Sequence, residues 1–269
     1  MSKTDIGIDL GTANTVITLG KKGVVLSEPS AIAYHTHTKE VLAVGKRAYQ
    51  MIGKTPDYIE VIRPLSGGVI SDDRMTQYMI REFILQVTGH RLTKPRIIIC
   101  VPSFITDVEK RAVVEAAMSA APERRIIIDE PIAALIGAGV NIGKARGNMV
   151  VDIGGGTTDV AIVSMNGIVT SHSVRAAGNT LDQAIIRYMQ TKYKLLIGER
   201  TAERLKIEMT NLYDPERMLR HGSRDGIWSA VCRKCRKSAS WRSSRLWKMW
   251  WRTSSRQSRP SWKRHRRNW

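Results

Sequence analysis

Cysteine is scarce in this sequence, and tryptophan is absent from its first 212 residues. Three Cys in 269 residues exclude a small domain held together by disulfide bonds. The apolar runs are only as long as strands, and Asp5 and Asp9 stand where a secretory signal would need an unbroken apolar segment. We therefore expect a cytoplasmic protein, long enough for one large domain or two smaller ones.

The positive charge is unevenly distributed along the chain. The net charge is +19, but residues 1–212 account for only +5 and residues 213–269 for +14. All seven Trp and two of the three Cys also lie in residues 213–269. The chain thus has two unrelated compositions, and any function in nucleic-acid binding would depend on the second.

Apolar strands and amphipathic helices alternate along the first 212 residues, which predicts an α/β fold. Apolar residues recur every four positions from Met75 to Val87, as in a helix with one buried face. Thr106 and Glu109 have the spacing of a capping box, and Pro131 can open a helix as its first residue. We expect a hairpin over residues 5–20, strands over 30–36, 40–45, 95–103 and 124–131, and helices over 71–88 and 107–121.

Residues 149–165, MVVDIGGGTTDVAIVSM, repeat the pattern of the first hairpin: an apolar strand, Asp, a Gly-containing polar turn and a second apolar strand. Asp152 corresponds to Asp9 and Gly154 to Gly11. The repeat predicts two related halves, with a site between them.

The two Gly turns are suited to binding phosphate. Without a Cβ, backbone N–H groups can converge on an anion, and Thr hydroxyls add donors. The Asp that precedes each turn would repel a phosphate unless a divalent cation or its waters lay between them, so a nucleotide with Mg²⁺ fits both features. Either turn alone is equally compatible with a structural hairpin, and it is the matched pair that favours phosphate binding.

Glu130 follows a strand and precedes Pro131, so it should project from the start of a helix toward the site. A carboxylate there could orient a water for attack on the γ-phosphate. Acidic residues also favour helix N-termini through the helix dipole, although the neighbouring Asp129 is the better candidate for the cap.

Four segments, in order, resemble the MreB family of bacterial actin homologues: GIDLGTANT, IDEPIAALIG, VVDIGGGTTDVAIVS and IGERTAERLKIE. They correspond to its phosphate-1, connecting, phosphate-2 and nucleotide-contacting segments. The resemblance implies an actin-like (ribonuclease H-like) ATPase fold, with two related halves around a nucleotide cleft and an incomplete second half. Residues 1–145 would form the first domain, with a small insertion at about 33–75, and residues 146–225 would begin the second.

The resemblance also implies a role for each matching residue. The phosphate contacts fall to Thr12, Ala13 and Asn14 in the first turn, and to Gly154, Gly155, Gly156 and Thr157 in the second. Glu130 matches the hydrolytic glutamate, Glu203 and Lys206 match the pair beside adenosine, and Asp9 and Asp152 would hold Mg²⁺ through water. From the residues alone, Glu203 and Lys206 equally fit a surface ion pair one helical turn apart.

The implied function is that of an ATP-binding protein that polymerises into filaments at the inner face of the membrane, where it guides the cell-wall elongation machinery and maintains rod shape. The loop GHRLTKP offers Leu92 between Arg91 and Lys94 for shallow insertion into anionic lipid, or it is a plain surface loop. Two other ATPases of the superfamily, chaperones and sugar kinases, share the first turn, but the chain is too short for a chaperone's substrate domain and shows no sugar-binding carboxylate set.

Residues 226–269 show no periodicity. Basic residues interleaved with Trp could bind RNA or a membrane surface, and Cys232 with Cys235 could be half of a zinc or redox site. A change of reading frame near Gly226 explains them better. Read one nucleotide earlier, Trp247 to Arg256 can encode LEDVVENIVK, and the segments IWSAVCR and SWKRHRRNW can encode LVSGLP and LEKTPPEL, all of which resemble the same family. We therefore expect an out-of-frame, disordered tail, no specific nucleic-acid partner, and a defective, truncated form of the protein.

Overall fold

The computed structural model describes residues 5–89, 96–103, 106–120 and 125–209. The chain divides into two compact units, residues 1–177 and residues 178–269, which are described separately. Among the described residues, no helix is both long enough and apolar enough to cross a membrane. The predicted membrane loop around Leu92 and the predicted out-of-frame tail lie outside the described residues.

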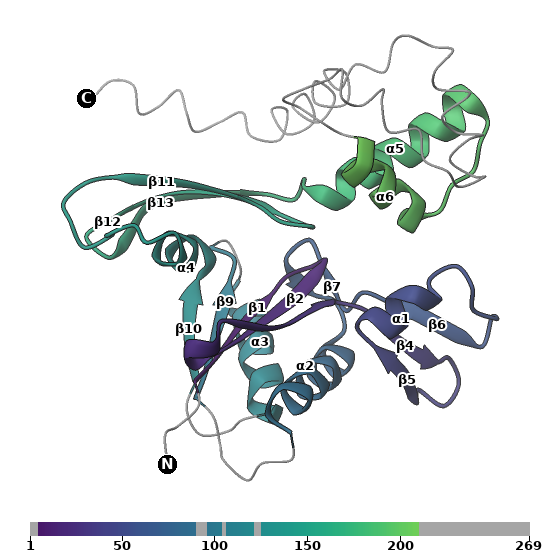
Figure 1. The fold of residues 1–269 in the computed structure, drawn as a ribbon, viewed down its shortest axis with the longest axis horizontal. Helices are drawn as coiled ribbons and strands as arrows, with labels where there is room; N and C mark the ends of the chain where they lie inside the picture. Colours follow the sequence, from purple (N-terminus) through teal and green to yellow (C-terminus); the bar gives the residue numbers. More distant parts are fainter. Residues whose placement is uncertain (1–4, 90–95, 104–105, 121–124, 210–269) are drawn as a thin grey trace. The chain divides into compact units, whose positions relative to one another are not determined.

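A five-stranded sheet with the order β10-β9-β1-β2-β3 is the centre of the first unit (Figure 1). Strands β1 (Asp5–Leu10), β9 (Arg96–Val101) and β10 (Arg125–Asp129) are parallel, and β2 (Asn14–Leu19) and β3 (Val24–Pro29) continue the sheet antiparallel. The 3-10 helix η1 (Gly20–Lys22) connects β2 with β3. The predicted first hairpin is thus confirmed, and its turn lies at the carboxyl end of the parallel strand β1.

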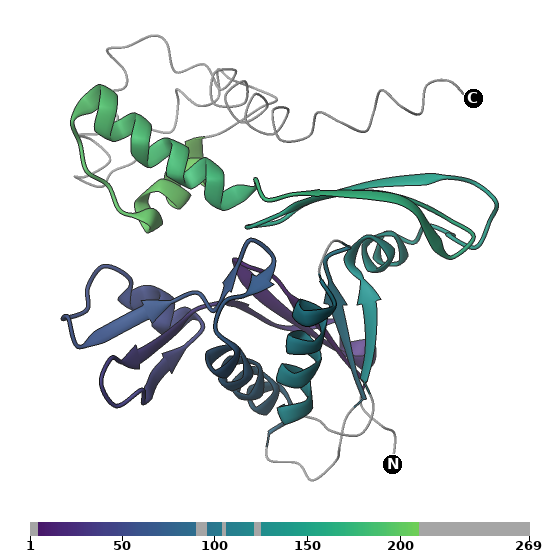
Figure 2. The same cartoon turned by 180° about the vertical axis from the view of Figure 1, so that it is seen from behind.

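Helices α2 (Asp73–Thr88) and α3 (Asp107–Ala120) cover one face of this sheet, which is the nearer face in Figure 2. In α2, Met79, Ile80 and Phe83 are buried against Ile8 and Ile99 of the sheet, as the four-residue apolar period predicts. Asp72 begins α2 by accepting a hydrogen bond from the Met75 N–H at 2.9 Å. The core is therefore built from the alternating inward residues of the strands and one stripe of the helix.

A smaller antiparallel sheet, β5-β4-β6, and helix α1 lie in the region predicted as an insertion, and that they form an insertion stays a prediction. Its elements are β4 (Ile32–His35), β5 (Val41–Val44), α1 (Lys46–Met51) and β6 (Ile59–Ile62). Between β6 and α2 lies a short hairpin, β7 (Leu65–Ser66) and β8 (Val69–Ile70), whose turn is Gly67-Gly68. The strand pattern did not predict β6, this hairpin or β3.

A third sheet contains the second predicted hairpin. Strands β11 (Asn148–Ile153), β12 (Thr158–Ser164) and β13 (Gly167–Val174) are antiparallel in that order. Helix α4 (Glu130–Gly137) has Pro131 in its first turn, as expected, and packs Leu135 against Val163 and Ile142. One face of this sheet is therefore covered by α4.

The second unit is described over two helices, α5 (Gly178–Tyr193) and α6 (Glu199–Met209). Ile185, Met189 and Tyr193 of α5 are buried against Ala202 and Leu205 of α6. The predicted domain limits at residues 145 and 225 separate two related halves of the sequence, whereas the division at residue 177 separates two compact units. The predicted limits therefore stay a prediction.

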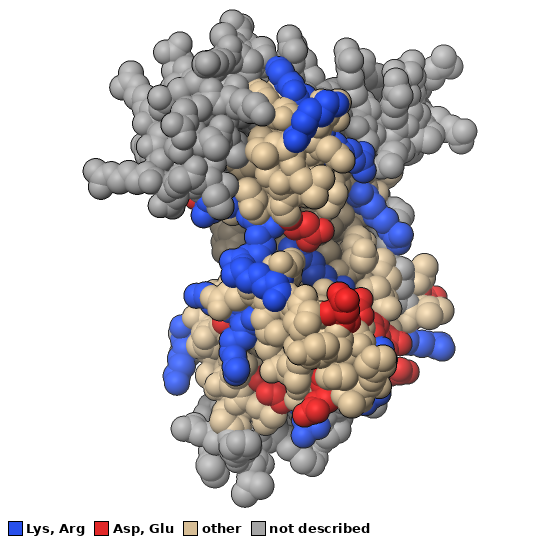
Figure 3. Space-filling view, turned by 90° about the vertical axis from the view of Figure 1, so that its right-hand side faces the viewer, with Lys and Arg blue, Asp and Glu red and all other residues tan. Residues whose placement is uncertain are grey.

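Basic and acidic side chains both occur on the face drawn in Figure 3. This mixture agrees with the small net charge of +5 over residues 1–212.

Candidate functional site

Ser30 holds the first Gly turn in place through two hydrogen bonds. The Ser30 hydroxyl donates to the Gly11 carbonyl at 2.6 Å, and the Ser30 N–H donates to the Ala13 carbonyl at 2.9 Å. All described peptide bonds are trans, so the Thr12 and Asn14 N–H groups point away from Ser30. The turn therefore presents backbone donors on its free side, which is what an anion site requires.

The second turn has the corresponding position in its own hairpin, with other anchoring contacts. The Gly154 N–H donates to the Thr157 carbonyl at 2.9 Å and closes the turn, and the Thr158 hydroxyl donates to the Ala176 carbonyl at 2.7 Å. Thr158 occupies the hairpin position that Thr15 occupies in the first copy, since Leu10 pairs with Thr15 and Ile153 with Thr158. Both Thr are buried and anchor their turns, so the internal repeat is structural as well as sequential.

The two turns face each other in direct contact. A Cβ added to Gly155 would lie 2.5 Å from the Ala13 Cβ, and one added to Gly156 would lie 2.6 Å from the Thr12 Oγ1. No side chain could be accommodated at either glycine without moving the other turn. The structure thus brings the predicted phosphate turns to one place.

A pocket lies where the turns meet, and most of the predicted site residues line it. Its lining is Asp9, Leu10, Gly11, Thr12, Gly68, Pro102, Glu130, Asp152, Gly154, Gly155, Gly156, Thr157 and Asp159. Of the other residues predicted for phosphate contact, Ala13 packs against Gly155, and Asn14 opens β2 with an exposed side chain. The roles of these residues stay predictions.

Four carboxylates share this pocket, and none of its described lining residues is Lys or Arg. Burial, followed by the charges of Asp9, Asp159 and Asp152, raises the pKa of Glu130 to about 8. Burial and the charge of Asp152 raise the pKa of Asp9, and burial and the charge of Asp159 raise the pKa of Asp152. Burial and mutual repulsion both disfavour the charged carboxylates, and a bound cation would offset both effects.

Asp159 is the member of this cluster that the sequence analysis missed. It is 2% exposed, and its Oδ1 has no hydrogen-bond partner. In the hairpin register Asp159 lies opposite Asp152, whereas Val16 lies opposite Asp9 in the first copy. The available signal was an Asp inside an otherwise apolar strand, directly across from a residue already identified.

Cys100 lies beside the acidic cluster, opposite Asp9 in the β1–β9 pairing. Burial and the charges of Asp9, Glu130 and Asp152 raise the pKa of its thiol to about 12. Since the thiolate is the reactive form, the raised pKa disfavours a role for Cys100 as a nucleophile.

The residue types present fit a hydrated divalent cation. Oxygen ligands are those that Mg²⁺ prefers, and Mg²⁺ commonly keeps several of its waters. No group of three or more His, Cys, Asp or Glu among the described residues is arranged to hold a metal ion directly. A cation bound through water would therefore match both the acidic cluster and the buried, unpartnered oxygen of Asp159.

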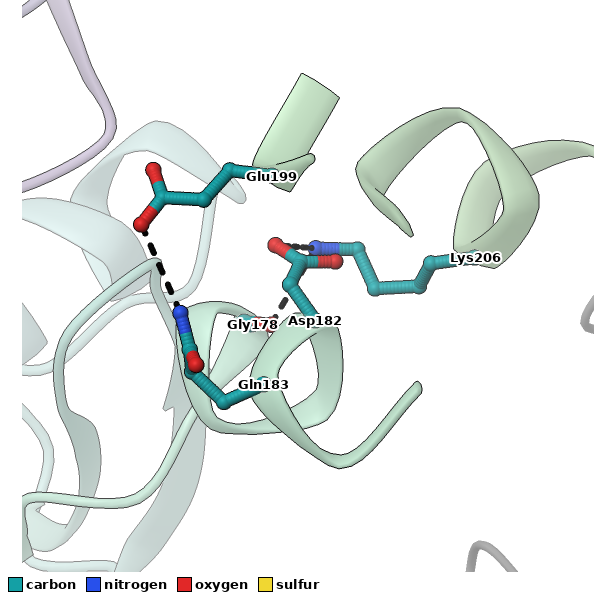
Figure 4. A network of polar contacts seen from close by, with 5 residues as sticks. All are labelled: Gly178, Asp182, Gln183, Glu199 and Lys206. Carbon is teal, nitrogen blue, oxygen red and sulfur yellow. Dashed lines mark hydrogen bonds and ion pairs between the residues drawn. The ribbon is translucent and has the colours of Figure 1, made fainter. Parts of the chain in front are cut away.

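The predicted adenosine pair lies in the second unit, on α6. The Lys206 ammonium donates to the Asp182 carboxylate at 2.9 Å and to the Gly178 carbonyl at 3.2 Å, which ties α6 to the first turn of α5 (Figure 4). Gln183 and Glu199 make a second link between the same helices. Glu203 is one turn before Lys206 and is half-buried. Whether this pair contacts adenosine stays a prediction.

Comparison with known proteins identifies the family. The model of the family described as MreB/Mbl protein matches residues 3–223. This chain belongs to the MreB/Mbl family. The cell shape-determining protein Mbl of Bacillus subtilis (strain 168) is 49% identical over 219 residues, which are 81% of this chain and 66% of Mbl. MreB of Escherichia coli (strain K12) is 48% identical over 219 residues, 79% of this chain and 63% of that protein. This MreB/Mbl chain thus spans slightly less than two thirds of the length of these relatives.

Solved structures give the same answer for the fold. MreB5 of Spiroplasma citri bound to ADP has a TM-score of 0.74 at 37% identity, covering 79% of this chain and 64% of that one. A MamK double helical filament has a TM-score of 0.66 at 20% identity, covering 80% and 67%. The predicted actin-like α/β fold is confirmed, and the comparisons favour neither a chaperone, nor a sugar kinase, nor a basic nucleic-acid-binding protein.

Proposed function

We propose that this MreB/Mbl chain is a nucleotide-binding, actin-like cytoskeletal protein that determines rod cell shape by forming filaments along the inner face of the membrane, where it guides lateral wall synthesis. The observation that carries the proposal is the meeting of two anchored Gly turns over one acidic pocket. Related structures support it, because MreB5 of Spiroplasma citri was solved with ADP and with AMPPNP bound.

In this proposal the first-turn residues Thr12 to Asn14 and the second-turn residues Gly154 to Thr157 bind phosphate oxygens. Asp9 and Asp152 hold Mg²⁺ through water, and Asp159 adds a buried acceptor beside them. When bound, Mg²⁺ would offset the repulsion between carboxylates and phosphates. Glu130, at the start of α4, would orient the attacking water, and hydrolysis of ATP would be coupled to polymerisation.

Nucleotide binding is tested by equilibrium dialysis of the full chain against ADP, with Mg²⁺ or with a chelator. We expect binding that depends on Mg²⁺ and that Asp152→Asn weakens at least tenfold, since a charged contact is lost. Glu130→Gln should bind ADP normally, because its role lies in the hydrolytic step. Asp57→Asn, on an exposed turn outside the pocket, is the matched control. Binding that is unaffected by both the chelator and Asp152→Asn would contradict the proposed site.

Membrane association is proposed for the loop containing Leu92 and rests on the sequence. A single exposed Leu contributes little, so attachment should depend on many copies in a filament. The excess charge of residues 213–269 should bind anionic vesicles by itself. Vesicle sedimentation in high salt suppresses this electrostatic part, and Leu92→Ser should then reduce what binding remains. If Leu92→Ser and the wild type bind vesicles equally in high salt, the loop does not attach the protein to the membrane.

A further inference from the structure

The β7–β8 hairpin reaches the point where the two phosphate turns meet. Its tip residue Gly68 lines the same pocket as Thr12 and Thr157. The Gly68 N–H donates to the Thr12 Oγ1 at 3.0 Å, and a Cβ on Gly68 would lie 2.9 Å from the Thr157 Cγ2. The hairpin therefore contacts both turns, although it belongs to neither of the repeated motifs.

The tip can take this place because it consists of two glycines. Gly67 and Gly68 have φ angles of +56° and +79°, in the left-handed region that favours glycine and that tight hairpin turns use. The Gly67 Cα would lie only 3.0 Å from a Cβ on Gly156. The hairpin tip thus packs against the backbone of the second turn and against the Thr12 and Thr157 side chains.

The base of the hairpin is fixed to the fold. The Pro64 carbonyl accepts hydrogen bonds from the Ser71 N–H at 2.9 Å and from the Ser71 hydroxyl at 3.0 Å. Leu65 is buried in the same core as Met79 of α2. The base of the hairpin is thus fixed next to the start of α2, which suits the tip to hold another group in position.

The group that it holds is the Thr12 hydroxyl. Thr12 is 6% exposed, so its hydroxyl has little access to bulk water. Because its oxygen already accepts from the Gly68 N–H, its own proton remains available for an acceptor in the pocket. A hydroxyl that accepts one hydrogen bond becomes a stronger donor of the next.

We propose that Gly68 is a positioning residue of the phosphate site: its N–H orients the Thr12 hydroxyl as a donor to a phosphate oxygen, and the β7–β8 hairpin forms a third wall of the pocket. This rests on the proposed nucleotide binding. The buried Asp159 Oδ1, which has no hydrogen-bond partner in the same pocket, independently indicates that the pocket is built for a charged ligand and its cation.

The hydrogen bond is tested first without ligand, by amide hydrogen exchange of the segment around Gly68 in the full chain. Thr12→Val removes the acceptor while nearly keeping the shape, and Thr12→Ser restores it. We expect faster exchange at Gly68 in Thr12→Val and wild-type exchange in Thr12→Ser. Equal exchange in all three proteins would overturn the positioning role.

The functional part is tested with Mg²⁺ and ADP as the probe, by measuring the dissociation constant. Thr12→Val and Gly68→Ala should each weaken binding about tenfold, the usual effect of losing one hydrogen bond to a charged group. The matched control is Gly53→Ala, because Gly53 has φ +71° and nothing within 4 Å of an added Cβ. This control has the same backbone strain without the contact, and it should bind as the wild type does.

The double variant separates positioning from simple crowding. If Gly68 acts through Thr12, adding Gly68→Ala to Thr12→Val should weaken binding little further. Additive losses, or equal losses in Gly68→Ala and Gly53→Ala, would overturn this inference and leave the proposed function intact. A wild-type chain that does not bind ADP with Mg²⁺ would overturn both.

Discussion

Gly155 of the second turn lies directly against Ala13 of the first, and an added Cβ on Gly155 would be 2.5 Å from the Ala13 Cβ. Since this contact joins the two turns, Gly155→Ala should push them apart. We expect a loss of stability of about 1–3 kcal/mol, typical of overpacking, and weaker nucleotide binding. Thermal unfolding and ADP dialysis measure the two effects.

Gly137 provides the control for this substitution. It lies at the end of α4, has no atom within 4 Å of an added Cβ and has an ordinary φ. Gly137→Ala should be neutral or stabilising, because Ala favours a helix over Gly by up to about 1 kcal/mol. If Gly155→Ala and Gly137→Ala have the same effects on stability and on ADP binding, the contact between the turns determines neither property.

Stability should fall as pH rises from about 5 to 8 because of Glu130. Its pKa in the folded chain is about 8, above the ordinary value of 4.5, so the folded state binds more protons than the unfolded state in this interval. The stabilising protonation is complete below the unfolded pKa and is lost as pH rises through the folded pKa. The whole change is on the order of 4 kcal/mol, and Glu130→Gln should remove most of it.

The measurement is the unfolding midpoint as a function of pH, made in a chelating buffer. With Mg²⁺ and ADP bound, the ionised carboxylates would have a counterion, so the slope in the wild type should also decrease. A Glu130→Gln variant whose stability depends on pH as steeply as that of the wild type would show that the slope arises elsewhere.

Much of the fold could be predicted because local patterns determine it. The strand alternation from Asp5 to Leu10 and the four-residue period from Met75 to Val87 each reported a buried face correctly. The β7–β8 hairpin was missed because its strands have two residues each, too few to show a period, although Gly67-Gly68 is a turn signal.

Only part of the acidic pocket could be predicted from the sequence, for a similar reason. Asp9 and Asp152 stand out as copies of one motif, but Asp159 has no counterpart in the first copy, where Val16 stands. Only the cross-strand register brings Asp159 opposite Asp152. Likewise, Lys206 could be assigned to a helix but not to Asp182, which is 24 residues away in sequence.

The Lys206–Asp182 contact should contribute more to stability than an exposed ion pair. The side chains are only 21% and 10% exposed, so Lys206→Met would leave a buried carboxylate without its counterion. We expect a loss of about 3 kcal/mol, less for Asp182→Asn, and a double variant less damaged than the sum of the two. Amide hydrogen exchange in α5 and α6 measures this loss of stability.

Arg204 and Glu208 offer a matched comparison on the same helix. They are 4.0 Å apart and nearly half exposed, a geometry whose contribution is usually below about 0.5 kcal/mol. Glu208→Gln, which removes this pair from the other side, should therefore change the exchange rates little. A cost equal to that of Lys206→Met would mean that burial does not set the strength of these pairs.

An apolar row on strand β11 should promote self-association of this chain. Met149, Val151 and Ile153 are 60%, 48% and 55% exposed on the face opposite α4, and β11 is at the edge of its sheet. Exposed apolar edges favour association. Val151→Lys should increase the monomer fraction in sedimentation velocity. Val150→Lys, on the face packed against α4, should instead lower stability, and a similar gain of monomer from it would contradict the assignment of the two faces.

We predict that the reading frame changes near Gly226. The family match ends at residue 223, and we predict that one change of frame accounts for the charge, the seven Trp and the Cys pair of the segment that follows. Because Trp and Met have one codon each, the protein sequence fixes the codons of Trp247 and of Met249 to Trp251. Sequencing the gene across codon 226 should show that the frame one nucleotide earlier encodes LVSGLP, LEDVVENIVK and LEKTPPEL, and its translation should extend the match to Mbl beyond residue 223. Codons that give no such segments in that frame would show instead that the basic, Trp-rich tail is the encoded sequence of an evolved protein.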